Sequence, residues 1–189
     1  MDITSNINLM AILYPFFNYY NKYFLIDKIL IMTNYSESIE ALNDLIQINH
    51  DRVAGYDRAV SEMKESDNLG TALIFEQYLK DSSTNIDQLS QYVREMGGTP
   101  ADSSTISGKV HRLWMDIKST FATHDKESAL ESCIFGDSAA IKAYEAAIAD
   151  TTNGFSSEIL GTLNRHLIAI KLAHTANEAY EKTLEKLNS

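Results

Sequence analysis

Proline, cysteine and valine are scarce in this sequence of 189 residues, which has two prolines and one cysteine. Few prolines leave long stretches that a helix can occupy without a break, and few β-branched valines disfavour strands. The single cysteine, Cys133, excludes a disulfide within the chain, and its apolar neighbours indicate a small buried side chain rather than a nucleophile. We therefore expect an all-α protein that works in a reducing compartment, the cytoplasm.

Positive charge is scarce as well. The chain has 16 Lys and Arg against 26 Asp and Glu, which gives a formal net charge of -10. Nucleic acids and anionic lipid surfaces both favour clustered Lys and Arg, and the sequence has no such cluster. We therefore expect no nucleic-acid partner, and no membrane partner for residues 32–189.

Residues 1–31 differ in composition from the rest of the chain. They are rich in Asn, Ile, Phe and Tyr, and their acids and bases balance, so the net negative charge lies downstream. The segment lacks the basic start and small-residue cleavage site of a secretory signal, and polar residues interrupt a membrane span. We interpret it as an atypical upstream extension with Met32 as the natural start. A weak interfacial or membrane anchor is the alternative. One domain is expected over residues 32–189.

Hydrophobic periodicity predicts four long helices downstream of Met32. They are expected at roughly 36–66, 72–96, 126–150 and 159–187. The first pair and the last pair are each joined by a short turn. The stretch between the pairs is too long for a hairpin loop, and it contains a short amphipathic helix from Val110 to Phe121. Two hairpins joined by one long crossover predict a ferritin-like four-helix bundle.

Polar residues interrupt the apolar stripe near the middle of each predicted helix. They are Asn49 and Tyr56 on the first, Ser82 or Ser83 on the second, Asp137 on the third, and His166 or His174 on the fourth. Ferritin-like di-iron proteins place their ligands at this level, with one Glu from each of two helices and a Glu-x-x-His pair from each of the others. We predict that Asn49, Tyr56, Asp137 and His166 instead form a buried hydrogen-bonded layer that fixes helix register.

The Glu-x-x-His pattern occurs nowhere in the sequence. Leu163 and Lys171 stand three residues before His166 and His174, where the pattern requires Glu. Asp137 is the one carboxylate on an inward stripe, and a dinuclear centre needs several hard oxygen ligands. We therefore expect no catalytic residue and no cofactor. The alternatives are an iron-handling or oxidoreductase protein that binds iron or another transition metal, and a small-ligand pocket between helices.

Two glycines inside the predicted helices and three tyrosines among charged residues lead to two further predictions. Gly55 and Gly136 stand inside helices, where glycine costs stability, so we predict that the first and third helices approach closely there. Tyr78, Tyr92 and Tyr180 stand among charged residues, and exposed aromatics of this kind often mark association sites. They suggest a homodimer.

Several segments, taken together, resemble a bacterial family of small ferritin-like four-helix-bundle proteins whose domain has no known function. They are LNDLIQINHDRVAGYDRA, REMGGTP, SGKVHRLWMDIK and ESCIFGDSAAIKAY, and residues 1–31 lie outside the resemblance. Where that family usually has Cys-Glu-Arg-Gly-Glu-Asp, this chain has CIFGDS over residues 133–138. The resemblance implies the bundle fold and supplies no reaction. We expect a non-catalytic protein with an assembly or stress-related role.

Overall fold

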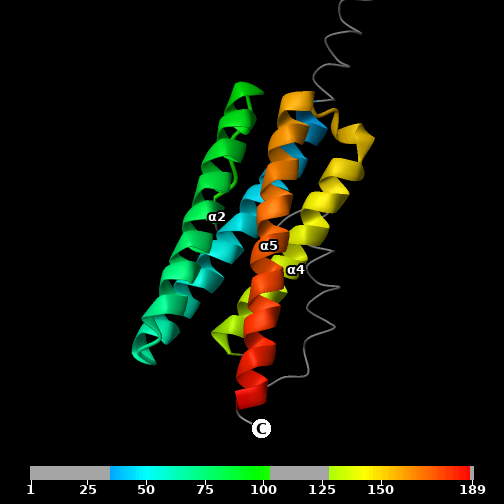
Figure 1. The fold of residues 1–189 in the computed structure, drawn as a ribbon. Coiled ribbons are helices and arrows are strands. Elements are labelled where there is room, and N and C mark those ends of the chain that lie inside the picture. The colour runs from blue at the N-terminus through cyan, green and yellow to red at the C-terminus, as the bar shows by residue number, and fades with distance from the viewer. Residues whose placement is uncertain (1–34, 103–127, 188–189) are drawn as a thin grey trace, which may run out of the picture.

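The computed structural model describes residues 35–102 and 128–187, and its regular structure is entirely helical within those ranges. The elements are a helix over residues 35–65, α2 (Leu69–Glu95), α4 (Ala129–Ala149), a short 3-10 turn (Thr151–Asn153) and α5 (Ser157–Leu187) (Figure 1). The prediction of an all-α chain with four long helices is confirmed. The expected crossover helix and residues 1–31 lie outside the described residues.

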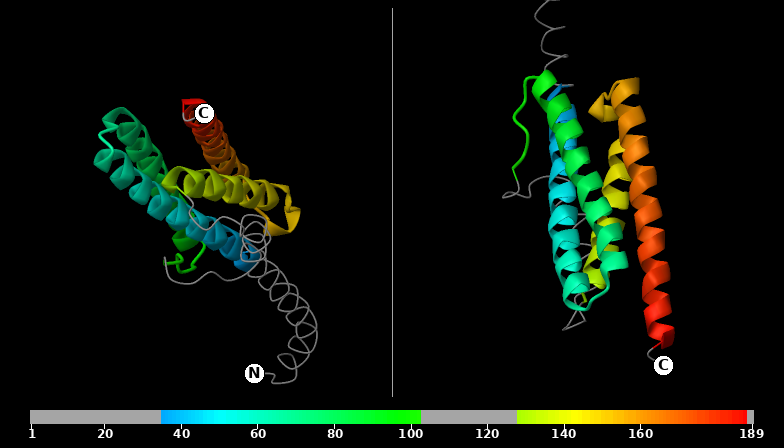
Figure 2. Two further views of the ribbon diagram at one scale, coloured as in Figure 1. Left: turned by 90° about the horizontal axis from the view of Figure 1, so that it is seen from below. Right: turned by 60° about the vertical axis from the view of Figure 1, so that its left-hand side comes forward.

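The helices form two antiparallel hairpins. The 35–65 helix pairs with α2, and α4 pairs with α5 (Figures 1 and 2). The carboxyl ends of α2 and α4 lie at the same end of the bundle, so these two helices run parallel. Parallel second and third helices are what a single long crossover between two hairpins requires. The predicted ferritin-like bundle topology is therefore confirmed.

Local signals in the sequence set the helix ends. Ser128 and Glu131 form a capping box at the start of α4: the Ser128 hydroxyl accepts from the Glu131 N–H, and the Glu131 carboxylate accepts from the Ser128 N–H. After α2, Gly97 adopts a positive φ of 81°, and the Gly98 N–H donates to the Val93 carbonyl at 2.9 Å. This bond satisfies a carbonyl that the end of α2 would otherwise leave without a partner.

The core consists of two hydrophobic clusters along the bundle axis. One is built around Leu45, Leu89 and Leu163, and the other around Phe75 and Cys133. Cys133 is 3% exposed, and burial together with the nearby Asp137 carboxylate raises its pKa to about 12. The thiol therefore stays protonated, which agrees with its predicted role as a small buried side chain. Within the described residues, no helix combines the length and the apolarity needed to cross a bilayer.

The prediction of close helix approach at Gly55 and Gly136 is wrong. A Cβ atom added at either position would meet no other atom within 4 Å. The close approach occurs instead at Gly98, just past α2, where a Cβ would lie 2.9 Å from Cγ2 of Ile39. Ile39 lies on the 35–65 helix, so Gly98 lets the chain leave α2 directly against that helix.

We expect Gly55→Ala and Gly136→Ala each to raise the free energy of unfolding by about 0.5–1 kcal/mol, because alanine costs less backbone entropy in a helix and has room here. Gly98→Ala should lower it by about 1–3 kcal/mol, because Ile39 would have to move. Urea unfolding of the three variants measures these changes. A loss of stability in both helical variants would contradict the open space around those glycines.

Candidate functional site: the polar centre of the bundle

A buried ion pair lies at the centre of the bundle. Nε of Arg52, from the 35–65 helix, lies 2.9 Å from Oδ1 of Asp137 on α4, and both side chains are almost fully buried. Nη1 of Arg52 donates to the Ser82 hydroxyl on α2 at 2.8 Å. Arg52 therefore joins three of the four helices.

The second carboxylate oxygen of Asp137 is also engaged. The Tyr56 hydroxyl donates to Oδ2 at 2.7 Å, and the Asn177 amide of α5 donates to the same oxygen at 3.1 Å and to the Tyr56 hydroxyl at 2.8 Å. The Tyr56 ring also contacts the pair, since Cζ of Arg52 lies 5.5 Å from its centroid. With Asn177, the network reaches all four helices.

Opposing effects act on the protonation of this pair. Burial raises the pKa of Asp137, while the Arg52 guanidinium and the Tyr56 hydroxyl act to lower it. Burial acts to lower the pKa of Arg52, but the Asp137 carboxylate, Tyr56 and Tyr144 together outweigh it, and the pKa is raised. Burial and the Asp137 charge also raise the pKa of Tyr56, so its hydroxyl remains a donor. Because Arg stays charged in proteins and the carboxylate accepts several hydrogen bonds, we infer an ionised pair.

A second network lies next to the first along the helices. The Asn49 amide donates to the Tyr144 hydroxyl of α4 at 2.8 Å and accepts from the Asn85 amide of α2 at 3.2 Å. The Tyr144 hydroxyl lies 3.1 Å from Nδ1 of His166 on α5, and Nε2 of His166 lies 2.8 Å from the Gln88 amide oxygen. This network also joins all four helices.

The partners of His166 define its tautomer. Since the Gln88 atom is an amide oxygen, Nε2 carries the hydrogen, and Nδ1 accepts from the Tyr144 hydroxyl. Burial and the charge of Arg165 lower the pKa of His166 to about 4. The imidazole is therefore neutral at physiological pH, the state in which each ring nitrogen matches its partner.

Asn49, Tyr56, Asp137 and His166, the predicted layer, are all buried and hydrogen-bonded to other side chains. They do not share one layer. Tyr56 and Asp137 belong to the ion-pair network, and Asn49 and His166 belong to the neighbouring one. Their role in fixing register remains a prediction.

Sequence reasoning missed Arg52, Tyr144 and Asn177. Tyr144 and Asn177 lie on the apolar stripes and Arg52 lies at the edge of one, where the spacing Asn49–Arg52–Tyr56 follows the helical period of three and four residues. That spacing could have identified Arg52. An arginine is rarely fully buried, however, so sequence reasoning ordinarily assigns the inward position to Val53 and places Arg52 on the surface. In the structure Arg52 is buried and Val53 is half-buried.

His174, the alternative candidate on α5, lies at the edge of this centre. Its side chain is 18% exposed, and Nε2 lies 3.5 Å from the carboxylate of Glu178, one turn further along α5. Its Nδ1 is buried and has no hydrogen-bond partner in the described part of the chain. The residue belongs to neither network.

The ferritin-like fold implies a di-iron centre at this level, and the residues present do not fit one. Asp137 is the carboxylate there, and its two oxygens already receive Arg52, Tyr56 and Asn177. The guanidinium adds a fixed positive charge that repels a metal cation. Throughout residues 35–102 and 128–187, no three His, Cys, Asp or Glu side chains are arranged to share a metal ion.

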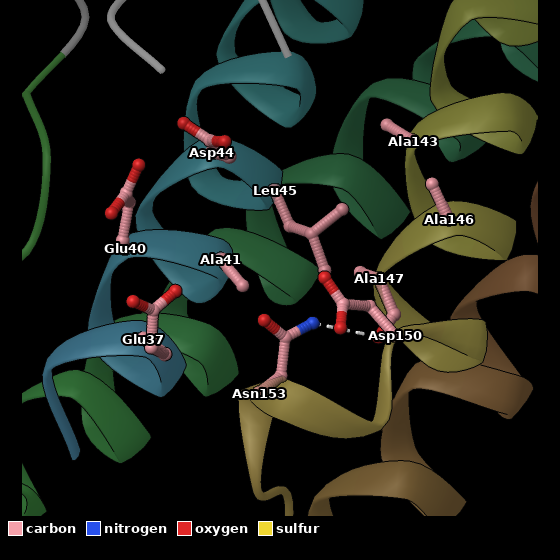
Figure 3. A pocket seen from close by; sticks show the side chains of 10 residues that line it. All are labelled: Glu37, Glu40, Ala41, Asp44, Leu45, Ala143, Ala146, Ala147, Asp150 and Asn153. Carbon is pink, nitrogen blue, oxygen red and sulfur yellow. Dashed lines mark hydrogen bonds between the residues drawn. The ribbon is translucent and has the colours of Figure 1, made fainter. Parts of the chain in front are cut away.

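A separate hollow of about 80 Å³ lies between the 35–65 helix and α4, close to the 3-10 turn (Figure 3). Its lining combines acids with small apolar residues: Glu37, Glu40, Ala41, Asp44, Leu45, Ala143, Ala146, Ala147, Asp150 and Asn153. The Asp150 carboxylate accepts from the Thr152 N–H at 3.0 Å and thus caps the 3-10 turn. This hollow contains none of the four predicted site residues.

The predicted association surface of Tyr78, Tyr92 and Tyr180 is also not as expected. All three tyrosines are half-buried, and each contacts another segment of the same chain. The Tyr92 hydroxyl lies 3.0 Å from that of Thr162, the Tyr180 hydroxyl accepts from the Asn68 amide at 2.7 Å, and the Tyr78 ring packs on Tyr56. These tyrosines therefore stabilise the bundle and are not free surface aromatics.

The helix order and the all-α core define a ferritin-like four-helix bundle. The chain belongs to the family described as Domain of unknown function (DUF2383), which matches residues 37–150, more than half of its length. This confirms the resemblance to a ferritin-like family of unknown function. No curated protein matches the chain. A solved structure of ferritin-like, diiron-carboxylate proteins from Bacillus anthracis strain Ames is similar, with 16% identity and a TM-score of 0.49, over 82% of this chain and 98% of that one.

Proposed function

We propose that this protein acts as a non-catalytic ferritin-like bundle, in assembly with other copies of itself, and not through a metal centre. The observation that supports this proposal is the closure of the bundle centre by its own side chains. Arg52 and Asp137 neutralise each other, and Tyr56 and Asn177 take up the remaining carboxylate oxygen. Both oxygens of the Asp137 carboxylate are therefore engaged and are not left to bind a metal or to accept a proton from a substrate.

The metal content of the protein tests this proposal. Protein expressed in medium supplemented with iron and zinc is expected to contain well under one equivalent of either metal per chain. Chelation should leave the melting temperature unchanged, because a bound metal would stabilise the native state by mass action. Stoichiometric metal that is lost from an Asp137→Asn or His166→Gln variant would favour the alternative, an iron-handling or oxidoreductase protein.

For self-association we propose the outward face of α5. Ile168 and Leu172 stand one turn apart on it and are 61% and 68% exposed, although both are large and apolar. Their neighbours on the exposed side include Ala176 and Ala179, whose small side chains allow a second helix to approach. A second copy of the chain would present the same apolar pair, which is the self-complementarity that a two-fold dimer needs.

We expect the protein to form a dimer at concentrations of tens of micromolar, and Leu172→Glu to shift it to a monomer by placing two carboxylates in the apolar contact. Sedimentation velocity measures the change. Thr84→Glu is the control for the added charge, since Thr84 is an exposed polar residue on a different helix, α2. A wild-type protein that is monomeric at all concentrations would remove the dimer from the proposal.

We also propose that the protein works in the cytoplasm and without nucleic acid. The free, buried Cys133 is compatible with a reducing compartment. The net charge of -10 opposes binding to phosphate backbones.

A further inference from the structure

The centre of the bundle has the chemistry of a guanidinium-binding site. The partners of the Arg52 guanidinium are acceptors and an aromatic face: the Asp137 carboxylate, the Ser82 hydroxyl and the Tyr56 ring. The Ser82 hydroxyl donates its own hydrogen to the Tyr78 carbonyl at 2.9 Å, so it presents lone pairs to Arg52. A planar cation with directional donors matches such a set of partners.

We propose that Arg52 is the resident cation of this bundle, and that the fold binds a guanidinium group at the level where ferritin-like bundles hold metal ions. This inference rests on the proposed function, in which no metal ion occupies the centre. Removal of the Arg52 side chain should leave a site that an external guanidinium ion can enter.

A divalent metal ion is a poor substitute in the same space. Oδ2 of Asp137 is engaged by Tyr56 and Asn177, which leaves Oδ1 as the carboxylate oxygen facing the cation. The Ser82 hydroxyl is a neutral ligand, and a transition metal requires about four ligands or more, including imidazole or further carboxylates. One carboxylate oxygen and one hydroxyl instead match two N–H groups of a guanidinium.

Rescue of Arg52→Ala by methylguanidinium tests the inference. The variant keeps the Asp137 charge and gains a cavity in place of the guanidinium. Methylguanidinium chloride at about 20–50 mM is expected to raise its melting temperature by about 2–5 °C relative to the same concentration of tetramethylammonium chloride, which has the charge but no donors. The wild-type protein should not respond. Neither should Arg52→Ala combined with Asp137→Asn, which no longer needs a cation.

If Arg52→Ala does not fold alone, methylguanidinium is expected to restore its helical circular dichroism signal, and tetramethylammonium is not. The same response of the variant to both cations, or to neither, would overturn the inference. So would stabilisation of Arg52→Ala by Zn²⁺ or Mn²⁺ in preference to methylguanidinium, since the centre would then be a metal site. These outcomes are independent of the metal content of the wild-type protein, which tests the proposed function.

Discussion

Replacing Asp137 by asparagine is expected to lower the free energy of unfolding by about 3–5 kcal/mol, because it leaves the Arg52 guanidinium buried without a counter-charge. The new amide would keep the size of the side chain and one acceptor oxygen, so the loss reflects the missing charge more than missing contacts. Urea unfolding at neutral pH measures it. Asp57→Asn is the matched control, because Asp57 is an exposed residue of the 35–65 helix and its loss should change stability by no more than about 0.5 kcal/mol.

Removing both charges should lower the free energy of unfolding by much less than the sum of the two single changes. In Arg52→Met combined with Asp137→Leu, apolar side chains of similar size replace the ion pair, and such replacements are often neutral or stabilising. The double-mutant cycle is therefore expected to give a coupling energy of about 2–3 kcal/mol between the two positions. Additive losses would show that Arg52 and Asp137 do not stabilise each other.

The bundle could be predicted from the sequence because each helix repeats its apolar residues with the helical period over many turns. A pattern of this length outweighs errors at single positions, and glycines and caps mark the ends. Hairpin pairing followed from the short turns, since the chain between α4 and α5 has no room for another arrangement. The contacts between helices could not be predicted in the same way. They depend on the rotation of each helix about its axis and on the distance between axes, and periodicity gives neither.

Arg52 and the glycines illustrate that limit. A sequence pattern places Arg52 and Val53 near the same boundary of the apolar stripe, and only the rotation of the helix decides which one faces the centre. Glycines inside helices, such as Gly55 and Gly136, suggest contact points between helices. Whether a neighbouring helix occupies the space beside a glycine depends, however, on the distance between the helix axes. The apolar stripe predicts that Asp137 faces inward, but it does not predict the cation that neutralises it, which comes from a residue 85 positions earlier.

His166 should make the stability of the bundle depend on pH in a way that a glutamine does not. In the native state the neutral ring accepts from Tyr144 through Nδ1 and donates to Gln88 through Nε2. Protonation would put a hydrogen on Nδ1 and oppose the Tyr144 donor. A glutamine can also accept from one partner and donate to the other, so His166→Gln should lower the free energy of unfolding at pH 7.5 by no more than about 1 kcal/mol. His166→Leu should lower it by about 1–3 kcal/mol at the same pH, because it leaves buried polar groups without partners.

The sign of the pH effect follows from the lowered pKa. The His166 pKa is about 4 in the native state against 6.5 for an ordinary histidine, so below pH 6.5 the unfolded chain binds a proton that the native protein does not. The stability that the wild type gains from its neutral His166 is fully present above about pH 6.5, and it is lost as the pH falls towards the native pKa. By about pH 4 the wild type should have lost on the order of 3 kcal/mol relative to His166→Gln. Urea unfolding of both proteins between pH 4 and pH 7.5 measures this difference, and subtracting the variant removes the contributions of Asp137 and the surface carboxylates. Parallel stability curves for the two proteins would mean that His166 is not held neutral by the bundle.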